Sequence, residues 1–351
     1  GGIYLLSVSV YAFCADARIA AWGMVIGEVV SAIYTILAYW YSRYIKERFG
    51  FCRFFSRQPH RQPARKKILP FSSLLREFFR FSVPLTINHF SLTIISSLEN
   101  LLIPLMLVQY LGSHPRALET YGTLTGMALP FLFFPATIVN SLSVMLLPAI
   151  SSSYKQKKMA LIKSTIAKSL HYCIVIGIFS TFAFLIYGNT LGEIIFDNPE
   201  AGHYVYLFAI LCPFMYVAQT ISSILNGFGQ TKQTLYHNLI GMAVRILFIL
   251  TAIPAAGIKG YLYGLLSGYA IQISLDLLCI FKISLFPFSV EKTLLLPSAL
   301  ALSGGLCSQQ LYHLLSGKTS LPPFFLLAVC GIFYGVFFTF FQLFLEHITN
   351  P

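Results

Sequence analysis

A few charged residues stand inside long apolar runs of this sequence, where charge is rare and costly. Glu99, followed by Asn100, lies in the run SSLENLLIPLML, Arg245 lies in the middle of a second run, and Glu28 lies in a third. Each run is long enough to cross a lipid bilayer, and a charge at the bilayer centre costs about 2.5–3.5 kcal/mol. Such residues face a cavity or a partner, so they are the first candidates for binding chemistry.

Glu99 and Arg245 carry opposite charges, and the distance between them decides what each can do. Alone in a low dielectric, a carboxyl group favours its protonated form, which suits a site that takes up and releases a proton. Beside an arginine it favours the carboxylate, and the two then form a buried ion pair that orders the helices. A guanidinium that no acid holds suits phosphate oxygens, which it binds with two parallel hydrogen bonds. The sequence leaves both alternatives open.

The elements that hold these residues are predicted to be membrane-spanning helices. The 351 residues are 56% hydrophobic and 10% charged, and the mean hydropathy of +0.73 lies outside the range of ordinary soluble domains. The chain begins with neither Met nor a signal peptide, and 1–14 is too short to span, so we expect the C-terminal part of a longer protein. The predicted full spans are 19–41, 81–109, 121–149, 166–187, 204–226, 234–254, 259–281, 293–312 and 322–345.

The distribution of basic residues predicts the orientation in the membrane. Most of the 24 Lys and Arg residues lie in the segment 43–67 and in the alternate loops 151–165, 227–233 and 282–292. The positive-inside rule places these segments, and with them the C-terminus, in the cytoplasm. The net charge of +12 therefore indicates topology and, for 43–67, contact with anionic membrane lipids, and not nucleic-acid binding. We expect a multi-pass protein of the cytoplasmic membrane.

Two spans share a ladder of small residues, which predicts an internal repeat. Such ladders let helix backbones approach closely, and their equivalent positions suggest two related halves of a transporter. The ladders are Gly23, Gly27 and Ser31 in the first span, and Gly260, Gly264 and Gly268 in 259–281. The repeat divides the chain into the last helices of a first lobe (1–42), a basic cytoplasmic linker (43–70), a six-helix lobe (71–282) and two additional helices (283–351).

Four stretches carry a resemblance to a known family: SLENLLIPLML (97–107), ETYGTLTGMALPFLFFPATIVNSLSVMLLPAIS (119–151), CPFMYVAQTISSILNGFGQTKQTLYHNLIGMAVRI (212–246) and IPAAGIKGYLYGLL (253–266). In these stretches and in its span count the chain resembles the multidrug/oligosaccharidyl-lipid/polysaccharide exporter superfamily, and within it the stage V sporulation protein B branch. The resemblance implies an all-α polytopic membrane fold of fourteen helices, about ten of them present here, in two lobes around a cavity that opens alternately to either side. It also implies a lipid-linked saccharide as substrate, which in a spore former would be a peptidoglycan precursor.

Roles for the polar residues follow from this expectation. The residues expected to bind substrate are Arg245, Asn88 and Asn226, and those expected to couple transport to a proton or a monovalent cation are Glu99, Asn100 and Glu28. Asp276 falls near the cytoplasmic end of its span, and we interpret it as an anchor at the membrane interface. The seven cysteines stand singly without the spacing of a metal site, so we expect no metal and no cofactor.

Two other functions are compatible with the sequence. A cation-coupled multidrug exporter of the same superfamily is the first, although the two additional C-terminal spans favour the saccharide. A membrane glycosyltransferase or polymer ligase is the second, and it would need a sizeable outer loop with paired acids, bases or a metal motif. The predicted outer loops are short and hold no such set apart from the acidic segment 188–203. We therefore expect a transporter and not an enzyme.

Overall fold

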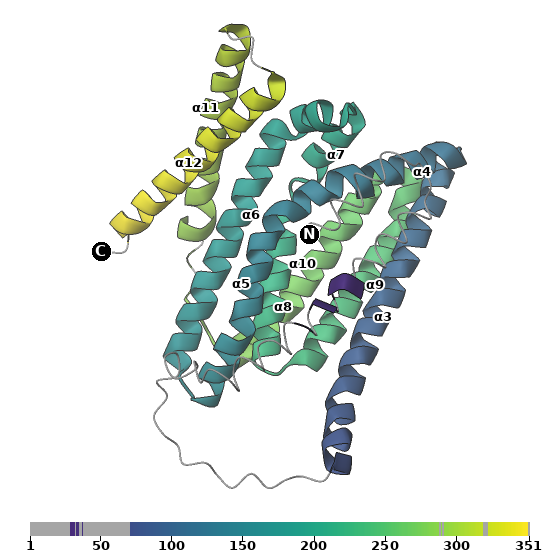
Figure 1. The fold of residues 1–351 in the computed structure, drawn as a ribbon, viewed down its shortest axis with the longest axis vertical. Helices are drawn as coiled ribbons and strands as arrows, with labels where there is room; N and C mark the ends of the chain where they lie inside the picture. Colours follow the sequence, from purple (N-terminus) through teal and green to yellow (C-terminus); the bar gives the residue numbers. More distant parts are fainter. Residues whose placement is uncertain are drawn as a thin grey trace. The chain divides into compact units, whose positions relative to one another are not determined.

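A computed structural model describes residues 29–31, 33, 34, 37, 71–287, 289, 291–318 and 322–349 (Figure 1). The chain divides into two compact units, Gly1–Leu75 and Arg76–Pro351, and most of the described residues belong to the second. The described residues contain helices and turns but no strand. The helices are α3 (Phe71–Leu111), α4 (His114–Thr123), the π-helical turn η2 (Leu124–Ala128), α5 (Leu129–Lys155), α6 (Met159–Phe196), α7 (Pro199–Phe208), α8 (Leu211–Gly227), α9 (Thr231–Ala256), α10 (Ile258–Ile283), the π-helical turn η3 (Glu291–Leu295), α11 (Leu296–Lys318) and α12 (Pro323–Thr349).

The chain is an all-α polytopic membrane protein. Within the described residues, six helical segments are long and apolar enough to cross a membrane, or seven if α7 and α8 form one bent span. α11, predicted to span at 293–312, is not among them, because Ser303, Ser308 and neighbouring glutamines make it more polar. The predicted span 19–41 and the linker 43–70 lie outside the described residues, apart from a few helical positions near Val30.

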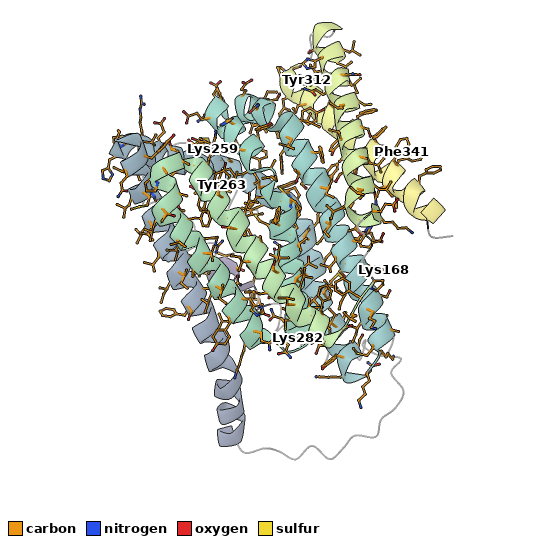
Figure 2. The ribbon with its side chains drawn as sticks, turned by 180° about the vertical axis from the view of Figure 1, so that it is seen from behind. Lys168, Lys259, Tyr263, Lys282, Tyr312 and Phe341 are labelled. Atoms are coloured by element: carbon orange, nitrogen blue, oxygen red, sulfur yellow. The ribbon has the colours of Figure 1, made fainter. Side chains whose placement is uncertain are left out.

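The basic loops of the lobe lie together at one end. The turn between α8 and α9 lies beside the end of α5, since a Cβ at Gly227 would stand 3.0 Å from Cβ of Ile150. α10 returns antiparallel to α9 and ends near Lys282, whereas Lys259 lies at the opposite end (Figure 2). The predicted loops 151–165, 227–233 and 282–292 are thus on the same side, as the alternation of charge requires.

The predicted span 204–226 is broken, which corrects the expectation of one continuous helix. α7 and α8 meet at Ala209 and Ile210 with a bend of 54°. Pro213 explains the break, because it has no N–H to donate to the carbonyl of Ala209 four residues earlier. That carbonyl accepts instead from the backbone N–H of Cys212 at 3.2 Å and from the hydroxyl of Thr181 on α6 at 3.0 Å, so it is not left unpaired.

The predicted outer loop 188–203 is mostly helical, because α6 continues to Phe196 and α7 begins at Pro199. Asp197 ends α6 in a left-handed conformation with φ of 50°. Asn198 then caps α7, since its Oδ1 accepts hydrogen bonds from the backbone N–H groups of Glu200 and Ala201 at 2.9 and 3.2 Å. A proline at the first helical position completes a typical helix start.

This cap gives a first prediction. Replacing Asn198 with alanine removes both side-chain acceptors and is expected to lower the free energy of unfolding by about 1 kcal/mol. Detergent-solubilised protein unfolded with a denaturing surfactant would measure the change. Asn198→Asp keeps an acceptor in place and serves as the matched control, so an equal loss in both variants would contradict the capping role.

Apolar side chains fill the space between the helices. Tyr216 on α8 is fully buried in the larger cluster and donates to the backbone oxygen of Leu132 on α5 at 2.9 Å. α11 and α12 pack against α6, where the ring of Tyr334 stacks on Phe179 with centroids 4.8 Å apart. Other large apolar side chains remain exposed, as in Phe134 on α5, which suits a surface that faces lipid.

The second glycine ladder lies where α9 and α10 touch. A Cβ at Gly260 would stand 2.3 Å from the oxygen of Ala252, one at Gly264 would stand 2.8 Å from Cβ of Phe248, and one at Gly268 would stand 2.5 Å from Cγ of Arg245. The prediction that this ladder permits close backbone approach is confirmed. Gly23 and Gly27 of the first ladder lie outside the described residues.

Candidate functional site

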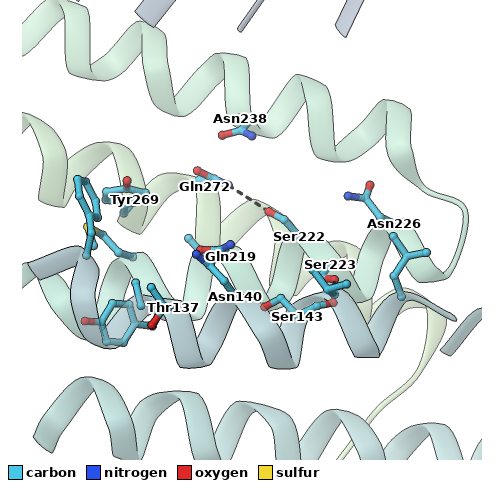
Figure 3. A pocket seen from close by; sticks show the side chains of 17 residues that line it. Thr137, Asn140, Ser143, Gln219, Ser222, Ser223, Asn226, Asn238, Tyr269 and Gln272 are labelled. Carbon is cyan, nitrogen blue, oxygen red and sulfur yellow. Dashed lines mark hydrogen bonds between the residues drawn. The ribbon is translucent and has the colours of Figure 1, made fainter. Parts of the chain in front are cut away.

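A cavity of about 1000 Å³ opens between α5, α8, α9 and α10. Figure 3 shows amide and hydroxyl side chains converging on it from all four helices. The described residues that line it include no charged side chain. Its polar lining consists of Thr137, Asn140, Ser143, Tyr216, Gln219, Ser222, Ser223, Asn226, Asn238, Tyr269 and Gln272, and its apolar lining includes Phe133, Val144 and Met215.

Two polar atoms in this lining are buried without a hydrogen-bond partner, namely Oδ1 of Asn226 and Oγ of Ser143. By contrast, Nε2 of Gln272 donates to Oγ of Ser222 at 3.3 Å (Figure 3), and Ser223 donates to the backbone oxygen of Ser143. An unpaired buried acceptor costs about 1–3 kcal/mol. The cavity therefore favours an occupant that supplies hydroxyl or amide hydrogens.

Glu99 and Arg245 form a buried ion pair next to this cavity. Nε of Arg245 on α9 lies 3.2 Å from Oε1 of Glu99 on α3, and their side chains are only 14% and 10% exposed. Neither of these two atoms makes an aligned hydrogen bond, so the interaction between Arg245 and Glu99 is electrostatic. The distance supports the alternative in which Arg245 holds Glu99 as a carboxylate.

Tyr269 stands between the ion pair and the cavity. The guanidinium carbon of Arg245 lies 5.6 Å from the centre of the Tyr269 ring, within the range of a cation–π contact. The same ring lines the cavity. The methylene groups of Arg245 can reach the Tyr269 ring because they pass α10 at Gly268, which has no side chain to obstruct them. The ion pair thus contacts the cavity wall through the Tyr269 ring.

A second buried pair joins α9 and α10 nearer the basic end of the lobe. Nδ1 of His237 lies 2.7 Å from Oδ1 of Asp276, and the other carboxylate oxygen accepts from Oγ of Ser222 at 3.4 Å. Asp276 is completely buried. The prediction that it anchors the helix at the membrane interface is therefore wrong, because its charge is directed inward toward His237.

Residues 93–251 match the MatE family model. The chain carries a MatE domain. This domain contains α4 to α8, the C-terminal part of α3 and most of α9, and hence Glu99, Arg245 and His237, whereas Asp276, Tyr269 and Gln272 follow it on α10. The family is one of membrane transporters.

The chain is also similar in sequence to curated proteins. The chain is 24% identical to stage V sporulation protein B of Bacillus subtilis over 273 residues, which is 76% of this chain and 49% of the relative. It is 24% identical to sporulation protein YkvU of the same organism over 261 residues, 74% of this chain and 55% of the relative. An uncharacterized membrane protein of Methanocaldococcus jannaschii, MJ1375, is 27% identical over 217 residues, which is 61% of this chain and 47% of the relative. The chain thus spans about half the length of these relatives. No solved structure matches it significantly.

The structure separates the residues that the sequence grouped together. Within the MatE domain, Asn226 lines the cavity, but Arg245 stands behind Tyr269 and is paired with Glu99. Asn100 lies beside Glu99 on α3, and its Oδ1 accepts from the hydroxyl of Tyr121 at 3.0 Å. The side chain of Asn88 and all of Glu28 lie outside the described residues. The roles expected of these residues in substrate binding and coupling remain proposals.

Sequence reasoning missed two contributors around the MatE domain cavity. Asn238 lines the cavity, and its neighbour His237 turns toward Asp276. The consecutive polar residues His237 and Asn238 in an otherwise apolar span were a signal for this site. Neighbouring residues on a helix point in different directions, so two separate polar contacts were to be expected. Among the described residues, no group of three or more His, Cys, Asp or Glu side chains is placed to bind a metal ion.

Proposed function

We propose that this protein transports a lipid-linked saccharide, such as a peptidoglycan precursor, across the cytoplasmic membrane by alternating access. The MatE domain and the similarity to two sporulation proteins support a transporter of this kind. The observation that carries the choice of substrate is the cavity lining of amides and hydroxyls without charge. A sugar presents many neutral donors and acceptors, and these match the side chains present.

The unpaired atoms in the cavity support a sugar further. Oδ1 of Asn226 lacks a donor, and hydroxyl groups of a saccharide would supply one. Tyr269 and Phe133 add aromatic faces on which the apolar side of a sugar ring can pack. The pyrophosphate of such a lipid would need cationic partners, and Arg245 lies behind Tyr269, where it would have to leave Glu99 to bind a phosphate. Asn226 is a proposed substrate ligand because it lines the cavity, and Arg245 and Asn88 stay proposals from the sequence.

Export of cationic drugs, the alternative within the family, is less well supported by this lobe. A desolvated cation needs an acidic partner, and no acid occurs among the described residues that line the cavity. An enzymatic function is also disfavoured, since the predicted outer loop that held acidic residues forms the α6–α7 hairpin.

Transport also needs an energy source and a defined orientation in the membrane. We propose that a proton or monovalent cation drives transport, that the basic segment 43–67 contacts anionic lipids, and that the basic loops and the C-terminus face the cytoplasm. The gathering of these loops at one end of the lobe supports that orientation.

Removal of a cavity amide gives the test. Asn226→Leu and Gln219→Met each remove one neutral hydrogen bond, and we expect binding of a polyprenyl-pyrophosphate sugar to weaken about two- to tenfold per variant. Binding and transbilayer transfer of a fluorescent analogue would be measured with the full-length protein in proteoliposomes. Gln310→Met removes an exposed amide from α11, away from the cavity, and is the matched control. Unchanged transfer in both cavity variants, or drug efflux without saccharide transfer by the wild type, would refute the proposal.

A further inference from the structure

The pair formed by His237 and Asp276 is buried on one side and reaches solvent on the other. Asp276 lies about 10 Å from the end of α10, taking 1.5 Å per residue, and is completely buried. His237 faces it from α9 at 2.7 Å and is 17% exposed. The imidazole is therefore the only part of the pair that is accessible from outside the helix bundle, and a proton reaches the carboxylate through it or through its other neighbours.

The two buried pairs of the lobe differ in how readily they change charge. An arginine stays protonated under all physiological conditions, so in the first pair only Glu99 could gain a proton, and the positive charge of Arg245 beside it opposes that gain. A histidine gains and loses a proton near neutral pH. With a neutral imidazole the pair at Asp276 carries one negative charge, and when one ring nitrogen accepts a proton from solvent the pair becomes neutral overall.

The dyad is also connected to the cavity. Ser222 donates to the second oxygen of Asp276 at 3.4 Å, and Gln272, one turn before Asp276 on α10, donates to Ser222 at 3.3 Å. Both Ser222 and Gln272 line the cavity (Figure 3). A change in the charge of Asp276 and His237 thus acts on two hydrogen bonds of the cavity wall.

The surroundings favour a proton over a metal cation at this site. Both oxygens of Asp276 already accept hydrogen bonds, and among the described residues no group of three or more acidic, His or Cys side chains is placed to complete a cation site around it. Asp276 is the sole acid on α8, α9 and α10, all of whose residues are described. Apart from His237 and the tyrosines, the titratable and charged side chains on these three helices are Cys212, Lys232, Arg245, Lys259, Cys279 and Lys282.

We propose that His237 and Asp276 form a proton-binding site that couples proton uptake to the cavity through Ser222 and Gln272. This inference rests on the proposed transport function and names the dyad, in place of Glu99, as the group that carries the coupling proton. Asp276 positions the imidazole and stabilises its charged form, and Ser222 transmits the change to the cavity.

The first experiment measures the proton site without any transport. The full-length protein, labelled with ¹⁵N-histidine in nanodiscs, is followed by NMR, and the His237 signal is identified by its loss in His237→Gln. We expect the ring to change from its neutral to its cationic form as the pH is lowered across the range in which the protein stays folded. A ring that keeps one form throughout the titration overturns the proposal.

The second experiment measures coupling in proteoliposomes that carry a fluorescent polyprenyl-pyrophosphate sugar. We expect saccharide transfer by the wild type to be accelerated by a pH gradient, and His237→Gln, Asp276→Asn and Ser222→Ala to lose that acceleration, while Ser222→Ala keeps the NMR titration. Gln310→Met, on α11 and away from both the dyad and the cavity, should remain responsive to the gradient. Acceleration that survives in His237→Gln, or that follows a sodium gradient instead, overturns the inference. No saccharide transfer by the wild type would refute the proposed function, and the NMR titration would still decide whether the dyad binds a proton.

Discussion

Replacing Arg245 with alanine is expected to lower the free energy of unfolding by about 3–5 kcal/mol, the largest effect of any single charge removal in the lobe. Glu99 would then lose its counter-ion, since the contact of 3.2 Å to Nε of Arg245 is lost, and it must remain as an uncompensated buried charge or take up a proton. The packing of the arginine stem against Gly268 and of its guanidinium against Tyr269 is lost as well. Surfactant-induced unfolding in bicelles would measure the change.

A double variant separates the charge effect from lost packing. Glu99→Gln together with Arg245→Met removes both charges at similar volume, and such replacements of buried pairs are often close to neutral in stability. We expect the double variant to recover most of what Arg245→Ala loses. If the double variant is as unstable as the single one, the ion pair is not the reason for the loss. Substrate binding by Arg245→Ala should be measured on the folded fraction, so that a ligand role for this residue is not confused with stability.

Replacing Gly192 with alanine is expected to destabilise the lobe by about 2–3 kcal/mol through overpacking. A Cβ at Gly192 on α6 would stand 2.1 Å from the backbone nitrogen and 2.3 Å from Cα of Gly202 on α7. Both obstructing atoms belong to the main chain, so no side chain can rotate away and the two helices must separate. Thermal unfolding of the purified protein followed by circular dichroism would detect the loss.

Gly331→Ala provides the matched control for this prediction. Gly331 lies in α12, and a Cβ there would meet no atom within 4 Å. Alanine is favoured over glycine in a helix by up to about 1 kcal/mol, so this variant should be neutral or slightly more stable. Equal destabilisation by the two substitutions would show that the contact between α6 and α7 is not what requires glycine.

Much of the fold could be predicted because the hydropathy of a span and the charge of a loop depend only on residues that are consecutive in the sequence. The apolar runs that became α3, α6, α9 and α10 were found from composition, since a membrane demands about 20 apolar residues per span. The break between α7 and α8 was not found. Proline is frequent in membrane helices, and only the hydroxyl of Thr181 facing Ala209 shows that a bend at Pro213 is stabilised.

The candidate site was predictable only in part, because it depends on contacts between helices. That Glu99 and Arg245 need partners followed from the cost of burial, but their pairing required the distance between α3 and α9. The partner of Asp276 could not be deduced from its position near a helix end, since depth along a helix does not reveal which face points inward. Asn226 was found because an amide is conspicuous in an apolar span, and its place in the cavity came from the packing of α8.

The uncharged lining of the cavity determines how a bound ligand would respond to its medium. Dissolved ions screen attraction between charges over about 8 Å at physiological ionic strength, but they have little effect on hydrogen bonds between neutral groups. No described side chain that lines this cavity is charged. A neutral ligand bound in the cavity would therefore be held about equally well in dilute buffer and in concentrated salt.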